Sequence, residues 1–251
     1  MADKIFITVI GEICEDVYVY GESKRLSPEA PVPILIPHTV VKNSGMCGNT
    51  ANNLIALDKE VIIRLFHQEK PITKTRYIDD KTNHMFMRID EGDNDVERFV
   101  ITDYASECIE KSDVVVISDY NKGFLCDDML IKIGDLAKLV IMDTKRPLIP
   151  EVVNAFNFLK VNEDEYERNK RVLDKFIHKT IITLGKRGVK YLGEIIPSPD
   201  PKETIDVSGA GDTFTAAFTL KYYETNDIKR SIIYANNMAS IVVSKRGVAT
   251  P

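Results

Sequence analysis

From Val114 onward, short runs rich in β-branched residues alternate with longer segments of helical pattern. The expected strands are 114–118, 140–143, 158–161 and 180–184, and the expected helices are 127–139, 163–177, 211–223 and 228–243. Strands that alternate with helices form βαβ units, in which right-handed crossovers join parallel strands. The pattern therefore predicts an α/β fold with a doubly wound, mostly parallel sheet flanked by helices. The continuous apolar run 4–10 adds a central strand buried on both faces.

A second, smaller sheet is expected from the first hundred residues. Pro28, Pro31 and Pro33 keep the chain extended there, because proline fixes φ and restricts the residue before it. Further strand candidates are 17–20, 32–41, 74–78, 85–90 and 98–102, and short polar links between the last three favour antiparallel pairing. A helix at 50–57, a strand at 61–65 and a hairpin-like pair at 189–192 and 204–207 complete the pattern. We expect one domain over 1–251, with a β-sheet lid drawn from about 12–44 and 74–103.

The composition limits the classes of function. Lys and Arg number 33 and Asp and Glu 38, so the formal charge is −5, and an acidic chain is a poor match for nucleic acid. No apolar run approaches the about 18 residues of a transmembrane helix, so no membrane partner is expected. The four cysteines show no CxxC pair and the four histidines are scattered, which indicates reduced thiols in a cytoplasmic protein rather than a zinc site.

A glycine-rich turn at the start of the helix expected at 211–223 suggests the chemistry. It reads Gly209-Ala210-Gly211-Asp212. Small residues at a helix start leave backbone N–H groups free at the positive end of the helix dipole, where they bind a phosphate or a phosphoryl group in transfer. A neighbouring carboxylate can accept the proton of a substrate hydroxyl. The turn predicts a small-molecule kinase with Asp212 as base, although a turn that only packs a strand closely on a helix would have the same sequence.

Polar loops follow five successive strands of the predicted sheet. They are 118–123, 143–146, 162–165, 185–188 and 208–212. In open α/β sheets, ligands bind outside the carboxyl ends of the strands. We therefore expect these loops to meet in one binding pocket.

In these motifs the chain resembles the ribokinase-like carbohydrate kinases, also called the phosphofructokinase B superfamily. The resemblance rests on 206–214, on Asn162-x-x-Glu165 and on Thr183-Leu184-Gly185-x-x-Gly188, and it runs in order from Lys4 to about Thr250. Within that superfamily, the proline-rich segment 25–33 is similar to the D-glycero-β-D-manno-heptose 7-phosphate kinases, as are 117–123, 73–76 and 87–90.

The resemblance implies ATP as phosphoryl donor, Mg²⁺, and phosphorylation of the anomeric hydroxyl of heptose 7-phosphate on the route to ADP-heptose and lipopolysaccharide. It leaves a monovalent cation open. By position it implies Asp212 as catalytic base and Gly209, Ala210 and Gly211 as anion hole. The nucleotide and magnesium candidates are Asn162, Glu165, Thr183, Gly185, Gly188 and Asn237, with Glu165 acting on the metal through water and no direct protein ligand assigned. Asn162-x-x-Glu165 is also typical of a helix capping box.

For the sugar phosphate, the resemblance implies a set of residues from the lid and the strand ends. They are Asp16, Arg25, Asn49, Lys74, Arg76, Arg88, Asp119 and Lys122. Asp16 and Asn49 match sugar-hydroxyl ligands. Lys74, Arg76, Arg88 and Lys122 are candidates for the substrate's own phosphate, although a basic residue on an exposed strand often only solvates an edge.

The chain also departs from the family pattern. Met46 follows Gly45 where the family has two glycines, 58–73 is too short for the family's intervening helix and strands, 163–177 is shortened, and the usual last helix is not expected within the 251 residues. Two alternatives stay open: a kinase of this fold that acts on fructose phosphate, ribose or a nucleoside, and a non-catalytic relative that binds nucleotide or sugar phosphate. An exposed lid edge makes a homodimer through the lid a further option.

Overall fold

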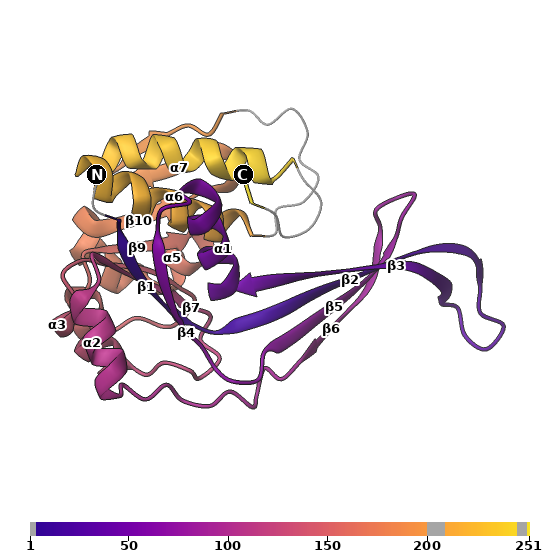
Figure 1. The fold of residues 1–251 in the computed structure, drawn as a ribbon. Coiled ribbons are helices and arrows are strands. Elements are labelled where there is room, and N and C mark those ends of the chain that lie inside the picture. Colours follow the sequence, from indigo (N-terminus) through magenta and orange to yellow (C-terminus); the bar gives the residue numbers. More distant parts are fainter. Residues whose placement is uncertain (1–3, 200–208, 245–249) are drawn as a thin grey trace.

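The computed structural model describes residues 4–199, 209–244 and 250–251. Its larger sheet has eight strands in the order β12-β11-β10-β9-β8-β7-β1-β4 (Figure 1). These are β1 (Phe6–Gly11), β4 (Ile62–Phe66), β7 (Val114–Asp119), β8 (Val140–Thr144), β9 (Phe158–Asn162), β10 (Thr180–Thr183), β11 (Val189–Tyr191) and β12 (Glu194–Ile196). β11 pairs antiparallel with β10 and β12, and the other neighbours are parallel. The predicted doubly wound, mostly parallel sheet is confirmed.

Helices cover both faces of this sheet, because parallel strands that are apolar on both sides must be buried on both sides. One face packs α2 (Asp103–Lys111), α3 (Asp127–Leu136), α4 (Pro150–Ala155) and α5 (Glu163–Leu173), the last followed by the 3-10 turn η1 (Asp174–Lys179). The other face packs α1 (Cys47–Leu57), α6 (Ala210–Thr225) and α7 (Ile228–Val242). A second 3-10 turn, η2 (Gly185–Arg187), follows β10. In the described ranges, no helix is long and apolar enough to cross a bilayer.

The smaller sheet is the lid, with the order β3-β2-β5-β6. Its strands are β2 (Ile13–Leu26), β3 (Pro33–Met46), β5 (Ile72–Asp79) and β6 (Met85–Glu91). β2 pairs antiparallel with β3 and parallel with β5, and β5 pairs antiparallel with β6. Figure 1 shows the long β2–β3 ribbon projecting from the α/β body.

The structure corrects the predicted lid strand at 98–102. That segment is not a strand but leads into α2, whose N-cap Thr102 accepts a hydrogen bond from the backbone N–H of Ala105. The ring of Phe99 packs against those of Phe66 and Phe124, with centroids 5.7 and 5.3 Å apart. The apolar residues of 98–102 therefore reflect burial against the main body, and the lid strands lie within 13–46 and 72–91.

Two short helices and one strand also differ from the expectation. α2 and α4 were not predicted, and α4 is too short, at six residues, to show a helical period. β12 takes the hairpin position beside β11, whereas the expected segment 204–207 lies outside the described residues. α3 ends at Leu136, earlier than expected, because Ala137 adopts an extended backbone.

The lid joins the body at Gly45 and Met46. A Cβ at Gly45 would lie 2.0 Å from Asp16 Oδ2, so this position requires glycine. Met46 has a positive φ of 56°, a backbone that costs most residues about 1–3 kcal/mol. Its side chain is 2% exposed and packs with Cys14 and Ile72, and this burial offsets the strain. The departure from the family's two glycines is thus accommodated by a buried side chain at the root of the lid.

A buried ion pair joins the ends of β7 and β8. Arg146 Nε lies 2.7 Å from Asp119 Oδ2, and their side chains are 6% and 0% exposed. The same arginine contacts Asp127 Oδ1 at 2.7 Å, but that side chain is 45% exposed. Thr144 Oγ1 donates to Asp119 Oδ2 at 2.7 Å. Asp119 therefore contributes to the fold, because its charge balances a buried guanidinium.

We expect Asp119→Ala to lower the free energy of unfolding by about 3–5 kcal/mol, because Arg146 would keep a buried charge without its main partner. Asp127→Ala removes the exposed partner of the same arginine and should cost no more than about 1 kcal/mol. Urea denaturation followed by circular dichroism measures both. Equal losses in the two variants would contradict the structural role of Asp119.

Candidate active site

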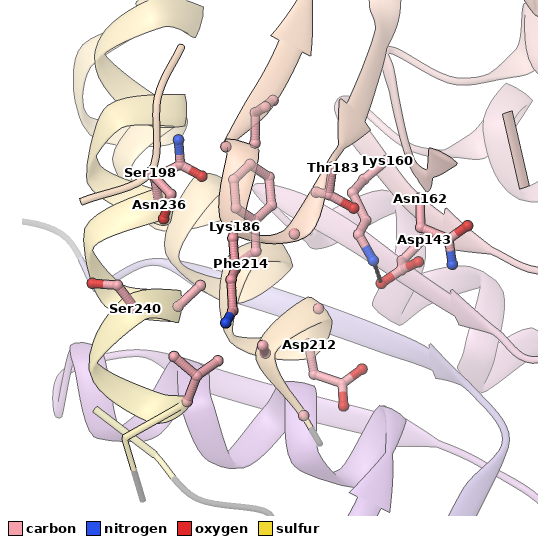
Figure 2. Close-up of a pocket in the computed structure, with 18 of the residues that line it drawn as sticks. Asp143, Lys160, Asn162, Thr183, Lys186, Ser198, Asp212, Phe214, Asn236 and Ser240 are labelled. Atoms are coloured by element: carbon pink, nitrogen blue, oxygen red, sulfur yellow. Dashed lines mark hydrogen bonds and ion pairs between the residues drawn. The ribbon is translucent and has the colours of Figure 1, made fainter. Parts of the chain in front are cut away.

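A cavity of about 500 Å³ opens at the carboxyl ends of β8, β9 and β10, beside the N-terminus of α6 (Figure 2). Nine of the predicted site residues line it: Asn162, Glu165, Thr183, Gly185, Gly188, Gly209, Ala210, Gly211 and Asp212. Figure 2 shows Asn236 and Ser240 of α7 on the side of the cavity opposite Lys160 and Asn162. The polar loops at the strand ends therefore meet in one cavity, as the sequence predicts.

The first turn of α6 faces this cavity. Its N-cap Gly209 has a left-handed backbone (φ 78°), which glycine adopts without strain, and no side chain caps the helix in the described part of the chain. The backbone of Gly211 lies close to the ammonium group of Lys160, since a Cβ at this position would lie 2.9 Å from Lys160 Nζ. Free N–H groups at a helix start next to an ammonium group can hold an anion.

The carboxylate of Asp212 is 4% exposed and is held from two sides. Its Oδ2 accepts a hydrogen bond from Asn49 Nδ2 at 2.8 Å, and its Oδ1 accepts one from the hydroxyl of Tyr120 at 3.0 Å. Asn53 Nδ2 donates to Asn49 Oδ1 at 3.0 Å and so orients that amide. Donors from α1 and from the loop after β7 thus fix a carboxylate of α6.

Burial raises the pKa of the Asp212 carboxyl to about 6. The hydrogen bond from Asn49 opposes this rise, the charge of Asp143 adds to it, and Lys160 and Tyr120 lower it. A carboxylate with a pKa near neutrality accepts a proton more readily than an ordinary aspartate and is still ionised at physiological pH. The position is therefore suited to a general base.

A buried ion pair lies at the cavity, formed by Asp143 of the predicted pocket loop 143–146 and by Lys160, which is not among the predicted site residues. Lys160 Nζ of β9 donates to Asp143 Oδ2 of β8 at 2.8 Å (Figure 2). Thr215 Oγ1 donates to the same oxygen at 3.2 Å. Burial lowers the pKa of the Lys160 ammonium, but the charge and hydrogen bond of Asp143 outweigh this, so the pKa is raised. Lys160 therefore stays charged beside Gly211. Its signal in the sequence is a lysine inside an otherwise apolar strand.

Asn162 and Glu165 form a capping box at the start of α5. Asn162 Oδ1 accepts from the N–H of Glu165 at 2.8 Å, and Glu165 Oε2 accepts from the N–H of Asn162 at 2.7 Å. The cap that the sequence left as an alternative is present, and the same residues line the cavity. Burial raises the pKa of the Glu165 carboxyl.

The donor set of the cavity fits Mg²⁺ held through water. Mg²⁺ keeps several of its waters and is usually bound through one or two carboxylates and substrate phosphates. Glu165 Oε1 has no hydrogen-bond or ion-pair partner among the described residues and is free to accept from such a water. A cluster of three or more metal-ligating side chains is absent from the described part of the chain.

The structure does not place Asn237 at the cavity. Asn237 is exposed on α7, and its neighbour Asn236 lines the cavity and donates to the carbonyl of Ile196 at 3.3 Å. Asn236, Ala239, Ser240 and Val243 line the cavity at helical spacing. This spacing of three, four and seven residues marks one helix face and could have corrected the prediction.

The basic residues predicted to bind substrate mostly have acidic partners. Arg76 Nη1 donates to Asp16 Oδ1 at 2.6 Å, so these two predicted substrate residues contact each other. Arg88 pairs with Asp90 at 2.6 Å, and Lys122 pairs with Asp93. Lys74 of β5 has no such partner in the described ranges, and its Nζ lies 5.5 Å from the centroid of the Tyr120 ring.

None of the eight predicted substrate residues lines the cavity, Asp119 and Arg25 included. Asp119 is paired with Arg146 in the interior and is not exposed to a ligand. Arg25 is exposed near the end of β2, on the projecting ribbon, and does not line the cavity. The sequence around Arg25 does not reveal that this residue is exposed on the ribbon. The position of Asp119 at a strand end does not reveal that Arg146 is its partner.

A doubly wound sheet with a β lid, and a buried carboxylate at a free helix start, define the class as a small-molecule kinase of the ribokinase fold. Ribokinase of Arabidopsis thaliana, solved with ribose and ATP, superposes with a TM-score of 0.72 at 18% identity, covering 98% of this chain and 94% of that one. Phosphofructokinase-2 of Escherichia coli, solved with potassium, gives 0.72 at 14% identity, covering 98% and 94%. These likenesses establish the fold.

The chain belongs to the pfkB family of carbohydrate kinases, whose model matches residues 57–251. It is 32% identical over 294 residues to the bifunctional protein HldE of Helicobacter pylori strain J99, across 97% of this chain and 64% of that protein. It is 29% identical over 292 residues to HldE of Nitratiruptor sp., across 97% and 62%. The chain thus spans less than two thirds of the length of these relatives. As a family member it is a phosphotransferase, and such kinases use ATP with a divalent metal ion.

The raised pKa of Asp212 predicts a stabilising substitution. Because the folded-state pKa of about 6 exceeds the ordinary 3.8, the fold prefers the protonated carboxyl, and that stability is lost as the pH rises through about 6. In Asp212→Asn the amide oxygen can accept from Asn49, the amide N–H can donate to the hydroxyl oxygen of Tyr120, and the charge is removed. The variant should therefore stabilise the fold at pH 8 by up to about 3 kcal/mol and by much less at pH 5. Differential scanning calorimetry at both pH values measures this. A lower Tm for the variant at pH 8 would contradict the prediction.

Proposed function

We propose that the protein transfers the γ-phosphoryl group of ATP to the anomeric hydroxyl of D-glycero-β-D-manno-heptose 7-phosphate, giving the 1,7-bisphosphate used for ADP-heptose and lipopolysaccharide. The observation that carries the proposal is the buried Asp212 carboxylate at the start of α6, where no side chain of the described residues caps the helix, in one cavity. The choice of heptose is supported by the similarity of 25–33 and 117–123 to heptose 7-phosphate kinases and by the 32% identity to HldE.

In this proposal Asp212 accepts the proton of the acceptor hydroxyl while the hydroxyl oxygen bonds to the γ-phosphorus. The bond between that phosphorus and the bridging oxygen breaks, and ADP leaves with its electron pair. The N–H groups of Ala210 and Gly211, together with Lys160, stabilise the charge of the group in transfer. Positioning and charge stabilisation supply most of the rate, and the base adds about 10²–10⁴-fold.

The nucleotide fits the part of the cavity that extends from α6 to α7. Thr183, Gly185 and Gly188 line it, together with Asn236 and Ser240. Bound Mg²⁺ would neutralise charge on the β- and γ-phosphates. Asn162 orients Glu165 through the capping box, and Glu165 would hold a water of the metal. Potassium is present in the phosphofructokinase-2 structure, so a monovalent cation belongs among the assay conditions.

Lys74 is the best candidate for the acceptor's own phosphate. Its side chain lies on β5 and is 9% exposed. Arg76 and Lys122 already have carboxylate partners, whereas Lys74 has none among the described residues. Because a buried ammonium without a counter-ion is costly, this position favours an anionic ligand. A phosphorylated sugar therefore suits the site better than ribose or a nucleoside.

The proposal is tested by ADP release with ATP, Mg²⁺ and K⁺ and a panel of acceptors. Heptose 7-phosphate should give the highest kcat/KM, ahead of fructose phosphates, ribose and nucleosides. Asp212→Asn should bind ATP with unchanged affinity while kcat falls by at least about 10²-fold, because the base is lost. Lys74→Met should raise the KM for phosphorylated acceptors and leave the KM for ATP unchanged.

Other outcomes of the same assay separate the alternatives. A preference for unphosphorylated sugars would contradict the role of Lys74 and favour a sugar or nucleoside kinase. Saturable binding of ATP with no ADP formed from any acceptor would favour a non-catalytic relative. Full turnover by Asp212→Asn would reject Asp212 as base.

We also propose that two copies associate through their lids. β3 and β6 are the edges of the four-stranded sheet, and apolar side chains on them are exposed, among them Ile36 at 61%, Val40 at 56% and Met87 at 52%. Exposed apolar edge strands favour pairing with another chain.

Sedimentation velocity is expected to show a dimer, and Ile36→Lys should convert it to a monomer because it places a charge on the lid edge. Ile233→Lys changes an exposed isoleucine of α7, at 52% against 61% for Ile36, and should leave the dimer intact. A monomeric wild-type protein at micromolar concentration would rule out association through the lid.

A further inference from the structure

Tyr120 occupies the junction of the lid, the α/β body and the catalytic carboxylate. It follows β7 and packs against the cluster of Cys14, Met46 and Ile72 at the root of the lid. Its hydroxyl donates to Asp212 Oδ1 at 3.0 Å. The roles of the anion site, the nucleotide site and the base do not by themselves require a tyrosine at position 120.

The backbone of Tyr120 is held in place by a buried carboxylate. Glu12 is 0% exposed and lies at the end of β1. Its Oε2 accepts from the N–H of Tyr120 at 2.8 Å, and its Oε1 accepts from the N–H of Lys122 at 2.8 Å and, more weakly, from that of Phe124 at 3.4 Å. A single side chain from the first strand therefore fixes the loop that carries Tyr120.

The ring of Tyr120 is fixed by two cations as well. Lys145 Nζ lies 3.8 Å from the ring centroid and Lys74 Nζ lies 5.5 Å from it. One lysine comes from the loop after β8 and the other from β5 of the lid. Cation–π contacts of this kind are attractive and restrict the plane of the ring.

We propose that Tyr120 is a positioning residue for the phosphoryl transfer: through its hydroxyl it holds the Asp212 carboxylate in the orientation and the charged state that accept the proton. This inference rests on the proposed function of Asp212 as base. Tyr120 and Asn49 each donate to a different oxygen of the carboxylate, and two donors fix its plane where one would leave it free to rotate. Each oxygen keeps a lone pair for the acceptor hydroxyl.

The other groups around Asp212 do not replace this hydrogen bond. The titratable groups that act on it are Cys14 of β2, Cys47 of α1, Tyr120, Asp143 of β8 and Lys160 of β9. The two thiols and the phenol stay neutral near pH 7, since burial raises their pKa. Asp143 and Lys160 are paired with each other. Among these groups the phenol is the one that donates to Asp212 directly.

Tyr120→Phe tests the proposal, measured as kcat and kcat/KM against pH between 5 and 9. Removing a hydrogen bond to the ionised carboxylate raises its pKa, so the acidic limb of the profile should move up by roughly one pH unit. At pH 8, where the base is ionised in both proteins, kcat should fall about tenfold, because the carboxylate is no longer held in the orientation that accepts the proton. The KM for ATP should not change.

Tyr191→Phe is the matched control. Tyr191 is buried on β11, and its hydroxyl donates to the carbonyl of His178 at 2.8 Å, away from the cavity lining. The control should lose a hydrogen bond without any shift of the acidic limb. Replacing Tyr120 by 3-fluorotyrosine keeps the shape of the ring and makes the phenol a stronger donor, so the limb should move down. This second variant gives an answer even if Tyr120→Phe folds poorly.

Three results would overturn the inference. An unchanged acidic limb in Tyr120→Phe, with or without a lower kcat, would show that the hydroxyl does not act on the base. A faster variant with a lower acceptor KM would show that Tyr120 merely occupies the place of the acceptor hydroxyl. A limb that moves equally in Tyr191→Phe would show a general effect on the fold. Failure of the proposed function itself is distinct, since it would appear as full turnover by Asp212→Asn.

Discussion

The rest of the site depends on one buried charge, the carboxylate of Asp212 in the first turn of α6. A carboxylate that is 4% exposed must be compensated by donors, and in the described residues these come from two other parts of the chain: Asn49 of α1 and Tyr120 after β7. The α/β core brings them together because all of these segments meet at the carboxyl edge of one parallel sheet. The same edge leaves the helix start open for an anion, so the base and the anion site arise from one arrangement.

The sequence predicts those features that depend on local pattern and on strand direction. Alternating strands and helices fix the doubly wound sheet, and parallel strands place their carboxyl-end loops side by side. For this reason nine predicted residues line one cavity even though they lie as far apart as Asn162 and Asp212. Local apolar content is less informative at 98–102, where Phe99 packs against the body and not in a lid strand.

What the sequence does not reveal is which charges find partners. Lys160 and Asp143 are 17 residues apart, and Glu12 accepts from the backbone N–H of Lys122 across 110 residues, so only the folded sheet shows these contacts. Arg88 and Asp90 are two residues apart, and their contact could have been foreseen as a local pair. A selection of substrate residues by positive charge alone therefore includes several that already pair with a carboxylate. Lys74 differs from them only in having no such partner among the described residues. The prediction named Asn237, whereas the helical period of α7 places Asn236 on the face that lines the cavity and Asn237 on the exposed face.

Two buried aspartates show why surroundings decide chemistry. Asp119 and Asp212 both lie at strand or helix ends next to small polar loops, and both are almost fully buried. Asp119 contacts a guanidinium at 2.7 Å, so its negative charge is balanced by a direct ion pair. Asp212 is held by a neutral amide and a phenol, while the nearby cation Lys160 is bonded to Asp143. Neutral donors fix the geometry of a carboxylate without removing its affinity for a proton, whereas a directly bonded cation removes it. The ammonium group of Lys160 is bonded to Asp143 and not to Asp212. It can therefore act on a phosphoryl group while Asp212 remains able to accept the proton.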